Sequence, residues 1–185
     1  MSAALVERTR GAETAVAVVA GCALLLVRPA LRDGPAPRLS LAVVYLVLLV
    51  GGALLRPRAG RLLPRGHAVP ALAIGVGAFA VGRVVAGGRP PSWVAGAVAL
   101  DIFAAAAEEA FFRRFVYDAL QPAGDIVAGT GAAVLFALVH VAVYGWWVVP
   151  LDLAAGLVLS WQRASTESWG VPAVTHVAAN LLMRL

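Results

Sequence analysis

The sequence predicts an all-α protein, a polytopic transmembrane bundle of about seven helices, and three observations support this prediction. Hydrophobic residues make up 61% of the chain and charged residues 14%, whereas soluble domains contain roughly 45–50% apolar and about 25% charged residues. The mean hydropathy of +0.86 points the same way. The apolar residues also form long unbroken runs without the apolar–polar alternation of a barrel strand. Most of the chain is therefore expected to lie in lipid.

Seven apolar runs are assigned as spans, because a hydrocarbon core of about 30 Å requires roughly 20 helical residues. The first five runs are long and the last two are short. Proline, glycine and charge signals interrupt helices, and they separate the runs in the order "RPALRDGPAPR", "RPRAGRLLPRGH", "GGRPPS", "QPAGD", Pro150 and "RASTESWG". The predicted spans cover about residues 14–31, 39–55, 68–87, 95–118, 127–149, 151–163 and 170–185.

The arginines between the spans predict a cytoplasmic N-terminus. All fifteen basic residues are arginine, and cytoplasmic loops carry an excess of positive charge. With the N-terminus inside, seven arginines lie on the cytoplasmic side and five on the outer side. The arginines form no stripe interleaved with aromatic residues, so no nucleic-acid partner is expected. The cytoplasmic set is Arg8, Arg10, Arg56, Arg58, Arg61, Arg65 and Arg163, and the outer set is Arg28, Arg32, Arg38, Arg89 and Arg184.

Ionisable residues at membrane depth are concentrated in the second half of the chain. Such groups cost several kcal/mol unless they are paired, so each one indicates a functional site by default. We expect one membrane domain over residues 1–185, in which residues 1–90 form accessory spans and residues 95–185 hold the site. The candidates are Arg83, Asp101, Glu108, Glu109, Arg113, Arg114, His140, Asp152 and His176, with Asn180 as an uncharged companion.

Helical spacing separates the two adjacent glutamates of "AEEAFFRRF". Glu109 and Arg113 are four residues apart, so they lie on one helix face and can form an ion pair. Glu108 lies about 100° round the helix and points elsewhere. We expect Arg113 to hold Glu109 ionised, and Glu108, with less compensation, to be suited to proton transfer. Asp101 is seven residues before Glu108 and is expected to line the same cavity.

Two further helices carry the histidines. His176 and Asn180 are four residues apart and share a face, and His140 follows Phe136 by the same spacing. A carboxylate, a lone histidine and a histidine–amide pair can together activate a water molecule and stabilise an oxyanion. The structural alternative is that the histidines and the asparagine only join helices and that the Glu–Arg pair only ties one helix turn to the next.

These residues fall into three blocks that resemble the signature of the CPBP family of intramembrane glutamic endopeptidases. That family includes the type II CAAX prenyl proteases and the bacteriocin-processing or immunity relatives. Glu108–Arg113 fits its EExxxR motif, Phe136–His140 fits FxxxH, and His176–Asn180 fits HxxxN. The order of the blocks also fits, and the resemblance covers roughly residues 95–185.

The resemblance implies an intramembrane endopeptidase of a bacterial plasma membrane. By analogy, Glu108 and His140 hold and activate the attacking water, Glu109 and Arg113 orient the site, and His176 with Asn180 stabilises the tetrahedral oxyanion. The implied partners are membrane lipid and a membrane-associated protein or peptide, with or without a lipid group. No cofactor is implied. No metal is expected either, because the chain has no HExxH motif and its histidines lie on separate helices. Nothing in the sequence sets the oligomeric state.

The fourth predicted span differs from the family pattern at one residue, and its length is set by the depth of the site residues. Many family members have glycine directly after the motif arginine, where this chain has Arg114, so we expect either a difference in local helix packing or a second cation that meets a substrate carboxylate. In addition, Glu108, His140 and His176 can reach a common depth only if the span continues to about residue 118, because each residue advances a helix by 1.5 Å. We therefore predict that Arg113 and Arg114 lie inside the helix and that Pro122 ends it.

Two other functions compete with peptide hydrolysis. A non-catalytic membrane-binding or bacteriocin-immunity protein could retain the three blocks as a polar core. A proton-coupled transporter could use buried acids and histidines as a relay. We rank the transporter last, because transporters usually have internal repeats and more spans, and the sequence shows neither.

Overall fold

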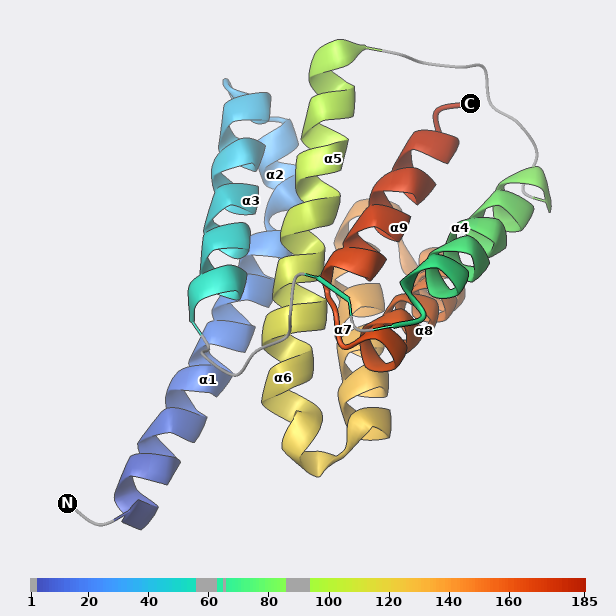
Figure 1. Ribbon diagram of the computed structural model, residues 1–185. Helices are drawn as coiled ribbons and strands as arrows, with labels where there is room; N and C mark the ends of the chain where they lie inside the picture. The colour runs from blue at the N-terminus through green and yellow to red at the C-terminus, as the bar shows by residue number, and fades with distance from the viewer. Residues whose placement is uncertain (1–2, 56–62, 65, 86–93) are drawn as a thin grey trace.

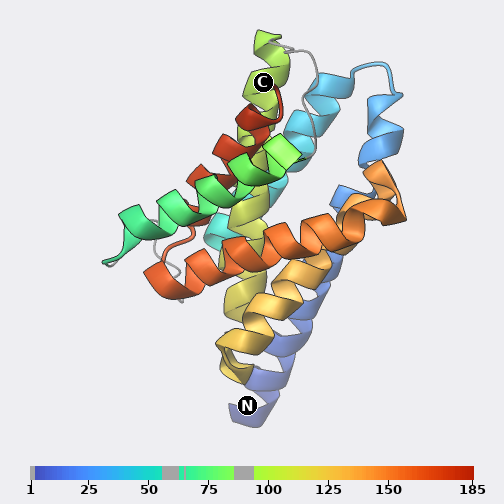
Figure 2. The same ribbon diagram turned by 90° about the vertical axis from the view of Figure 1, so that its right-hand side faces the viewer.

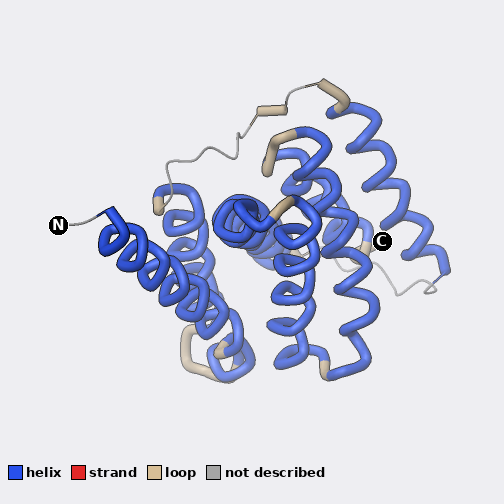
Figure 3. The backbone as a smooth tube through the Cα atoms, turned by 90° about the horizontal axis from the view of Figure 1, so that it is seen from below, coloured by secondary structure: helices blue, strands red, loops and turns tan. Residues whose placement is uncertain are grey.

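The structure is a computed structural model that describes residues 3–55, 63–64, 66–85 and 94–185. All the regular secondary structure in these residues is helical (Figure 3), which confirms the predicted all-α class. The elements are α1 (Ala3–Leu26), α2 (Arg28–Arg32), α3 (Pro37–Leu54), α4 (Ala68–Val85), α5 (Ala95–Glu109), the π-helix η1 (Ala110–Val116), α6 (Tyr117–Leu120), the 3-10 turn η2 (Gln121–Ala123), α7 (Asp125–Tyr144), the 3-10 turn η3 (Trp146–Val148), α8 (Val149–Thr166) and α9 (Gly170–Leu182).

Three of the described helices are long and apolar enough to cross a membrane by length and composition. They are α3, α4 and α7, with mean hydropathies of 1.9, 1.9 and 2.2. Two shorter apolar stretches, Gly11–Leu26 and Gly170–Leu182, add to them. Long exposed apolar faces on these helices are expected where lipid tails are the solvent. The membrane bundle predicted from composition is confirmed.

The helices surround a column formed by α5, η1 and α6 (Figure 1). The helices α1 and α3 lie on one side of this column, and α4, α8 and α9 lie on the other (Figures 1 and 2). The most extensive contacts join α7 to α8, α5 to α9, α3 to α5 and α4 to α9. The column therefore touches both groups of helices, and residues on it can face partners from either half of the chain.

Helix boundaries differ from the predicted ones at two places. The first predicted span breaks at Val27 into α1 and α2. The fifth ends at Tyr144, because Gly145 has φ 84°, a left-handed conformation that glycine adopts without strain. The predicted break between the fifth and sixth spans exists, but it lies at Gly145 to Val148 and not at Pro150 itself. Pro150 lies in the first turn of α8, where its missing N–H would have no partner in any case.

The fourth span runs without interruption to Leu120, as predicted, and both arginines lie inside it. Over Ala110–Val116 it widens into a π-helix, a form that is rare and frequent at functional sites. Arg163 of α8 donates from Nε to the backbone carbonyl of Arg113 at 2.9 Å, which satisfies one carbonyl of this segment. The 3-10 turn that contains Pro122 follows, and the chain reverses at Gly124 with φ 102°.

Two arginines that were predicted to lie in loops are buried in the bundle. Arg28 is 4% exposed and Arg163 is 8% exposed. Both contact carboxylates, Arg28 that of Glu108 and Arg163 that of Asp118. The count of loop arginines that predicts the orientation therefore loses Arg163 on the cytoplasmic side and Arg28 on the outer side. The difference between the two sides is unchanged, and the cytoplasmic N-terminus stays a prediction. The other loop arginines Arg56, Arg58, Arg61, Arg65 and Arg89 lie outside the described residues.

The contact between α7 and α8 depends on Gly156. A Cβ atom built there would lie 2.9 Å from the Cα of Ala133, closer than real Cβ atoms approach other heavy atoms. We expect Gly156→Ala to lower the free energy of unfolding by about 1–3 kcal/mol, because inserting a methyl group into a full contact forces the backbones apart. Thermal denaturation of the purified protein in detergent measures this change.

The matched control is Gly77→Ala on α4. Gly77 is exposed in a helix interior, and a Cβ atom there meets nothing within 4 Å. Alanine restricts the unfolded chain more than glycine does, so this variant should gain about 0.5–1 kcal/mol. Equal stability of the two variants would contradict the close packing at Gly156.

Candidate active site

Five of the predicted site residues meet where α5 passes into the π-helix. Glu108 and Glu109 end α5, Arg113 lies in η1, His140 is on α7 and His176 is on α9. All five are buried, and Glu109 and Arg113 have no exposed surface. Both imidazole rings pack against the ring of Phe136, with centroid distances of 4.5 Å for His140 and 5.7 Å for His176. The predicted common depth of the acid pair and the two histidines is confirmed.

Glu109 is the structural member of the acid pair, because one of its oxygens holds two partners. Its Oε1 accepts from Nη1 of Arg113 at 3.0 Å and lies 2.8 Å from Nδ1 of His176. The guanidinium of Arg113 also donates from Nη2 to the carbonyl of Gly156 at 3.2 Å and lies over the ring of Phe136 at 4.5 Å. The predicted pair of Glu109 and Arg113 is confirmed, and it fixes the orientation of His176.

Glu108 faces a different set of groups. Its Oε1 accepts from Nη1 of Arg28 at 2.6 Å, and its Oε2 lies 3.7 Å from Nε2 of His140. The expectation that Glu108 has little compensation is therefore wrong, because an arginine from the N-terminal half pairs with it directly. The two glutamates remain inequivalent, since Glu109 is tied within its own helix and to α9, whereas Glu108 joins α2 to α7.

The imidazole of His140 is oriented by its own helix. Its Nδ1 lies 2.7 Å from the backbone carbonyl of Phe136, one turn earlier. A carbonyl oxygen only accepts, so this contact places the proton of the neutral ring on Nδ1 and leaves Nε2 as an acceptor toward Glu108. Asp152 of α8 approaches the same Nδ1, at 3.7 Å from its Oδ2.

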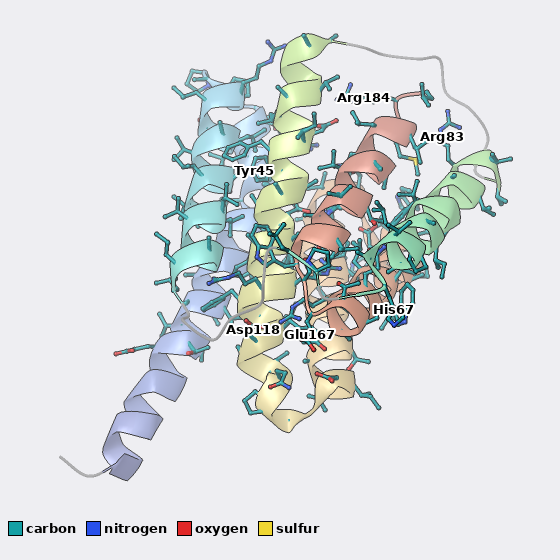
Figure 4. All side chains as sticks on the ribbon, in the orientation of Figure 1. Tyr45, His67, Arg83, Asp118, Glu167 and Arg184 are labelled. Carbon is teal, nitrogen blue, oxygen red and sulfur yellow. The ribbon has the colours of Figure 1, made fainter. Side chains whose placement is uncertain are left out.

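Two predicted residues lie apart from this cluster. Asp101 was expected to share the cavity with Glu108, but its Oδ2 binds Nη2 of Arg184 at 2.5 Å. The amide nitrogen of Asn180 donates to the backbone carbonyl of Asp101 at 3.3 Å. Figure 4 shows Arg184 near the C-terminal end of α9, whereas Asp118 lies toward the opposite end of the column. Asn180 therefore ties α9 to α5 about one turn from His176.

Sequence reasoning missed one residue of the site, Arg28, and left another, Asp152, without a partner. Arg28 was counted as a loop arginine, although it directly follows the apolar run "ALLLV" and precedes a proline. Asp152 was among the intramembrane candidates but had no assigned partner. No local spacing connects either residue to His140 or Glu108, because they approach from other helices. The position of Arg28 at the end of an unbroken apolar run was the available signal.

The arrangement can hold and polarise one water molecule. The 3.7 Å between Oε2 of Glu108 and Nε2 of His140 is too long for a direct hydrogen bond, and a single water can reach two acceptors that are this far apart. Both atoms are acceptors, so such a water would donate both of its hydrogens and keep a lone pair free. His176, which also packs against Phe136, has Nε2 as its remaining ring nitrogen, because Nδ1 contacts Glu109.

Comparison with known families agrees with this geometry. The fold is that of an all-α membrane bundle with a buried cluster of acids, histidines and an arginine. The type II CAAX prenyl endopeptidase Rce1-like family matches residues 90–182, which is half of the chain, and the chain belongs to that family. This match confirms the resemblance that the three blocks carry. No curated protein and no solved structure significantly matches the chain. Arg28 lies outside the matched residues, and the division into accessory spans 1–90 and a core 95–185 stays a prediction.

Proposed function

We propose that this chain is an intramembrane endopeptidase that hydrolyses a peptide bond of a membrane-associated protein or peptide with water activated by Glu108 and His140. The observation that carries the proposal is the pair of acceptors, Oε2 of Glu108 and Nε2 of His140, that face each other at 3.7 Å in a buried site. A general base must come within hydrogen-bond reach of the proton that it removes, and both atoms meet that condition for one shared water.

In the proposed reaction the water oxygen attacks the scissile carbonyl carbon, and Glu108 takes up the proton. The carbonyl oxygen becomes an oxyanion, and the tetrahedral centre then collapses as the C–N bond breaks. The proton passes from Glu108 to the leaving nitrogen, so the glutamate returns to its starting state. His140 holds the second hydrogen of the water through Nε2 and keeps the attacking lone pair directed at the carbon.

The oxyanion is assigned to His176, whereas Asn180, which the family resemblance pairs with it, lies apart from the cluster and holds α9 against α5. His176 can donate from Nε2 when the ring is doubly protonated, because its Nδ1–H is directed to Glu109. Preorganised donors of this kind stabilise the charge that develops in the transition state. Glu109 and Arg113 keep His176 in place through the contacts described above.

The family name indicates the substrate class to test first, a prenylated peptide that ends in a CAAX sequence. Purified protein in proteoliposomes is incubated with a farnesylated CAAX peptide and with the same peptide lacking the farnesyl group. Mass spectrometry of the products locates the cleaved bond. Hydrolysis of either peptide supports the proposal. Hydrolysis of neither, by protein that is folded and monodisperse, favours a binding or immunity protein with a polar core.

Substitution of His140 tests the assigned chemistry. We expect His140→Gln to lower kcat by about 10²–10³-fold, because the side chain keeps a polar end but no longer accepts from water in the same position. The matched control is His67→Gln. The chain has three histidines, and His67 is exposed and precedes α4. Equal loss of activity in both variants would count against a role for His140 in hydrolysis.

A further inference from the structure

Arg28 connects the N-terminal part of the chain to the proposed base. Its Nη1 contacts Oε1 of Glu108 at 2.6 Å, and its Nη2 lies 3.5 Å from the carbonyl of Val139, the residue before His140. The side chain is almost fully buried. Tyr45 of α3 also interacts with this guanidinium and packs edge-on against Phe103 of α5. Arg28 thus meets the helices that carry both water-binding groups.

The break between α1 and α2 sets the direction of this side chain. Pro29 has no N–H, so the carbonyl of Leu25, four residues earlier, loses its helical donor. The Nε of Arg28 donates to that carbonyl at 2.9 Å. This hydrogen bond fixes the guanidinium at Nε. Its Nη1 is then directed at Glu108 of α5, and its Nη2 at the carbonyl of Val139 of α7. Pro29 thus removes one backbone donor at the break, and the preceding Arg28 side chain replaces it.

The consequence for Glu108 is a fixed carboxylate. One oxygen is held by Arg28, and the other is the one that lies toward His140. A carboxylate without this anchor could rotate and present either oxygen or neither. Glu109 has its own anchor in Arg113, four residues later on another helix face.

We propose that Arg28 is a positioning residue for hydrolysis, which holds the carboxylate of Glu108 so that Oε2 faces His140. The inference rests on the proposed role of Glu108 as the base. It makes α1 and α2, which lie outside the family-matched residues, part of the active site. It also assigns the Arg28–Pro29 pair a function that neither residue would have alone.

The first test compares Arg28→Gln, Arg28→Lys and the control Arg32→Gln, on the same short helix but exposed. We expect Arg28→Gln to lower kcat by roughly 10²-fold with little change in KM, because a small misplacement of a catalytic group costs about that much. Lysine can restore the positive charge beside Glu108. It cannot at the same time donate a hydrogen bond to the carbonyl of Leu25 in the geometry of the arginine Nε. Arg28→Lys should therefore recover part of the lost rate, and Arg32→Gln should match the unmodified protein.

The second test keeps the charge and changes only its direction. In Pro29→Ala the new N–H can bond to the carbonyl of Leu25 as in an ordinary helix, and it competes with Nε of Arg28. We expect kcat to fall by about tenfold while the protein stays folded, since a shift of the guanidinium moves the carboxylate that it anchors. This variant decides the question if Arg28→Gln does not yield folded protein.

All rates are measured with the farnesylated CAAX peptide and normalised to the amount of folded, monodisperse protein. If Arg28 had only a structural role, the kcat of the folded variants would then be unchanged. A folded Arg28→Gln protein with unmodified kcat overturns the inference, and so does an unchanged kcat in Pro29→Ala when Arg28→Gln is unfolded. In both cases an inactive Glu108→Gln variant leaves the proposed function standing. Full activity of Glu108→Gln would instead overturn the proposed function itself.

Discussion

Replacing Glu108 with glutamine is expected to lower kcat by about 10⁴-fold, the upper end of the range for general acid–base catalysis. The reason is that Glu108 is the group that takes up the proton of the attacking water and later returns it to the leaving nitrogen. Glutamine keeps the shape of the side chain, and its carbonyl oxygen can still accept from Arg28. The measurement is the initial rate of peptide hydrolysis in proteoliposomes, with the folded fraction checked by size-exclusion chromatography.

Two controls separate catalysis from folding in this experiment. Glu13→Gln makes the same change on an exposed part of α1 and should leave the rate unaltered. In Glu108→Gln alone the buried Arg28 loses its anion, and removing one partner of a buried pair is destabilising. The double variant Glu108→Gln with Arg28→Gln removes both charges and should regain stability, because a neutral replacement of a whole pair is often harmless. It should remain inactive, and recovery of activity with stability would refute the assignment of Glu108 as the base.

The second large effect is expected for the folded state itself. Arg113→Met should lower the free energy of unfolding by about 3–5 kcal/mol, because it leaves the charge of Glu109 buried without its arginine partner. Both side chains have no exposed surface, and Arg113 also bonds to the carbonyl of Gly156. Thermal or denaturant unfolding in detergent measures the change. Adding Glu109→Gln to the same chain should restore a large part of the loss.

The neighbouring arginine is the natural comparison. Arg114 is only partly buried and donates to the backbone carbonyl of Gly52 on α3. We expect Arg114→Met to cost about 1.5 kcal/mol, the value of one hydrogen bond from a charged donor. If the two methionine variants lost the same stability, the pair of Glu109 and Arg113 could not be the principal buried tie of the π-helix segment.

Local patterns in the sequence predicted the helices and the contacts within one helix. The apolar runs placed the spans, and the i, i+4 spacing placed Arg113 beside Glu109 and Phe136 beside His140. Both are properties of a regular helix and need no knowledge of the neighbours. The requirement for a common depth also placed Arg113 and Arg114 inside the fourth span, because the rise per residue is fixed.

Contacts between helices could not be predicted in the same way. Arg28 and Glu108 form an ion pair although they are 80 residues apart in the sequence, and Asp101 and Arg184 pair at a separation of 83 residues. Nothing in the spacing distinguishes these partners from other arginines of the chain. The π-helix was also not predicted. An unbroken apolar run has the same sequence pattern in an α-helix and in a π-helix, which has more residues per turn. Its signals are the close approach of Gly52 to the backbone of Ala110 and the capping of the Arg113 carbonyl by Arg163, and both come from other helices.

The separation of Arg28 from Glu108 has a consequence for how the chain enters the membrane during synthesis. Helices are made in chain order, so the cation of α2 is already inserted when the acidic end of α5 emerges. Glu109 arrives together with Arg113 four residues later, as a pair that is neutral overall. Glu108 has no cation four residues away on its own helix face, and its partner Arg28 precedes it by 80 residues in the chain. The counter-charge of Glu108 is therefore synthesised before Glu108 itself, whereas that of Glu109 follows it by four residues.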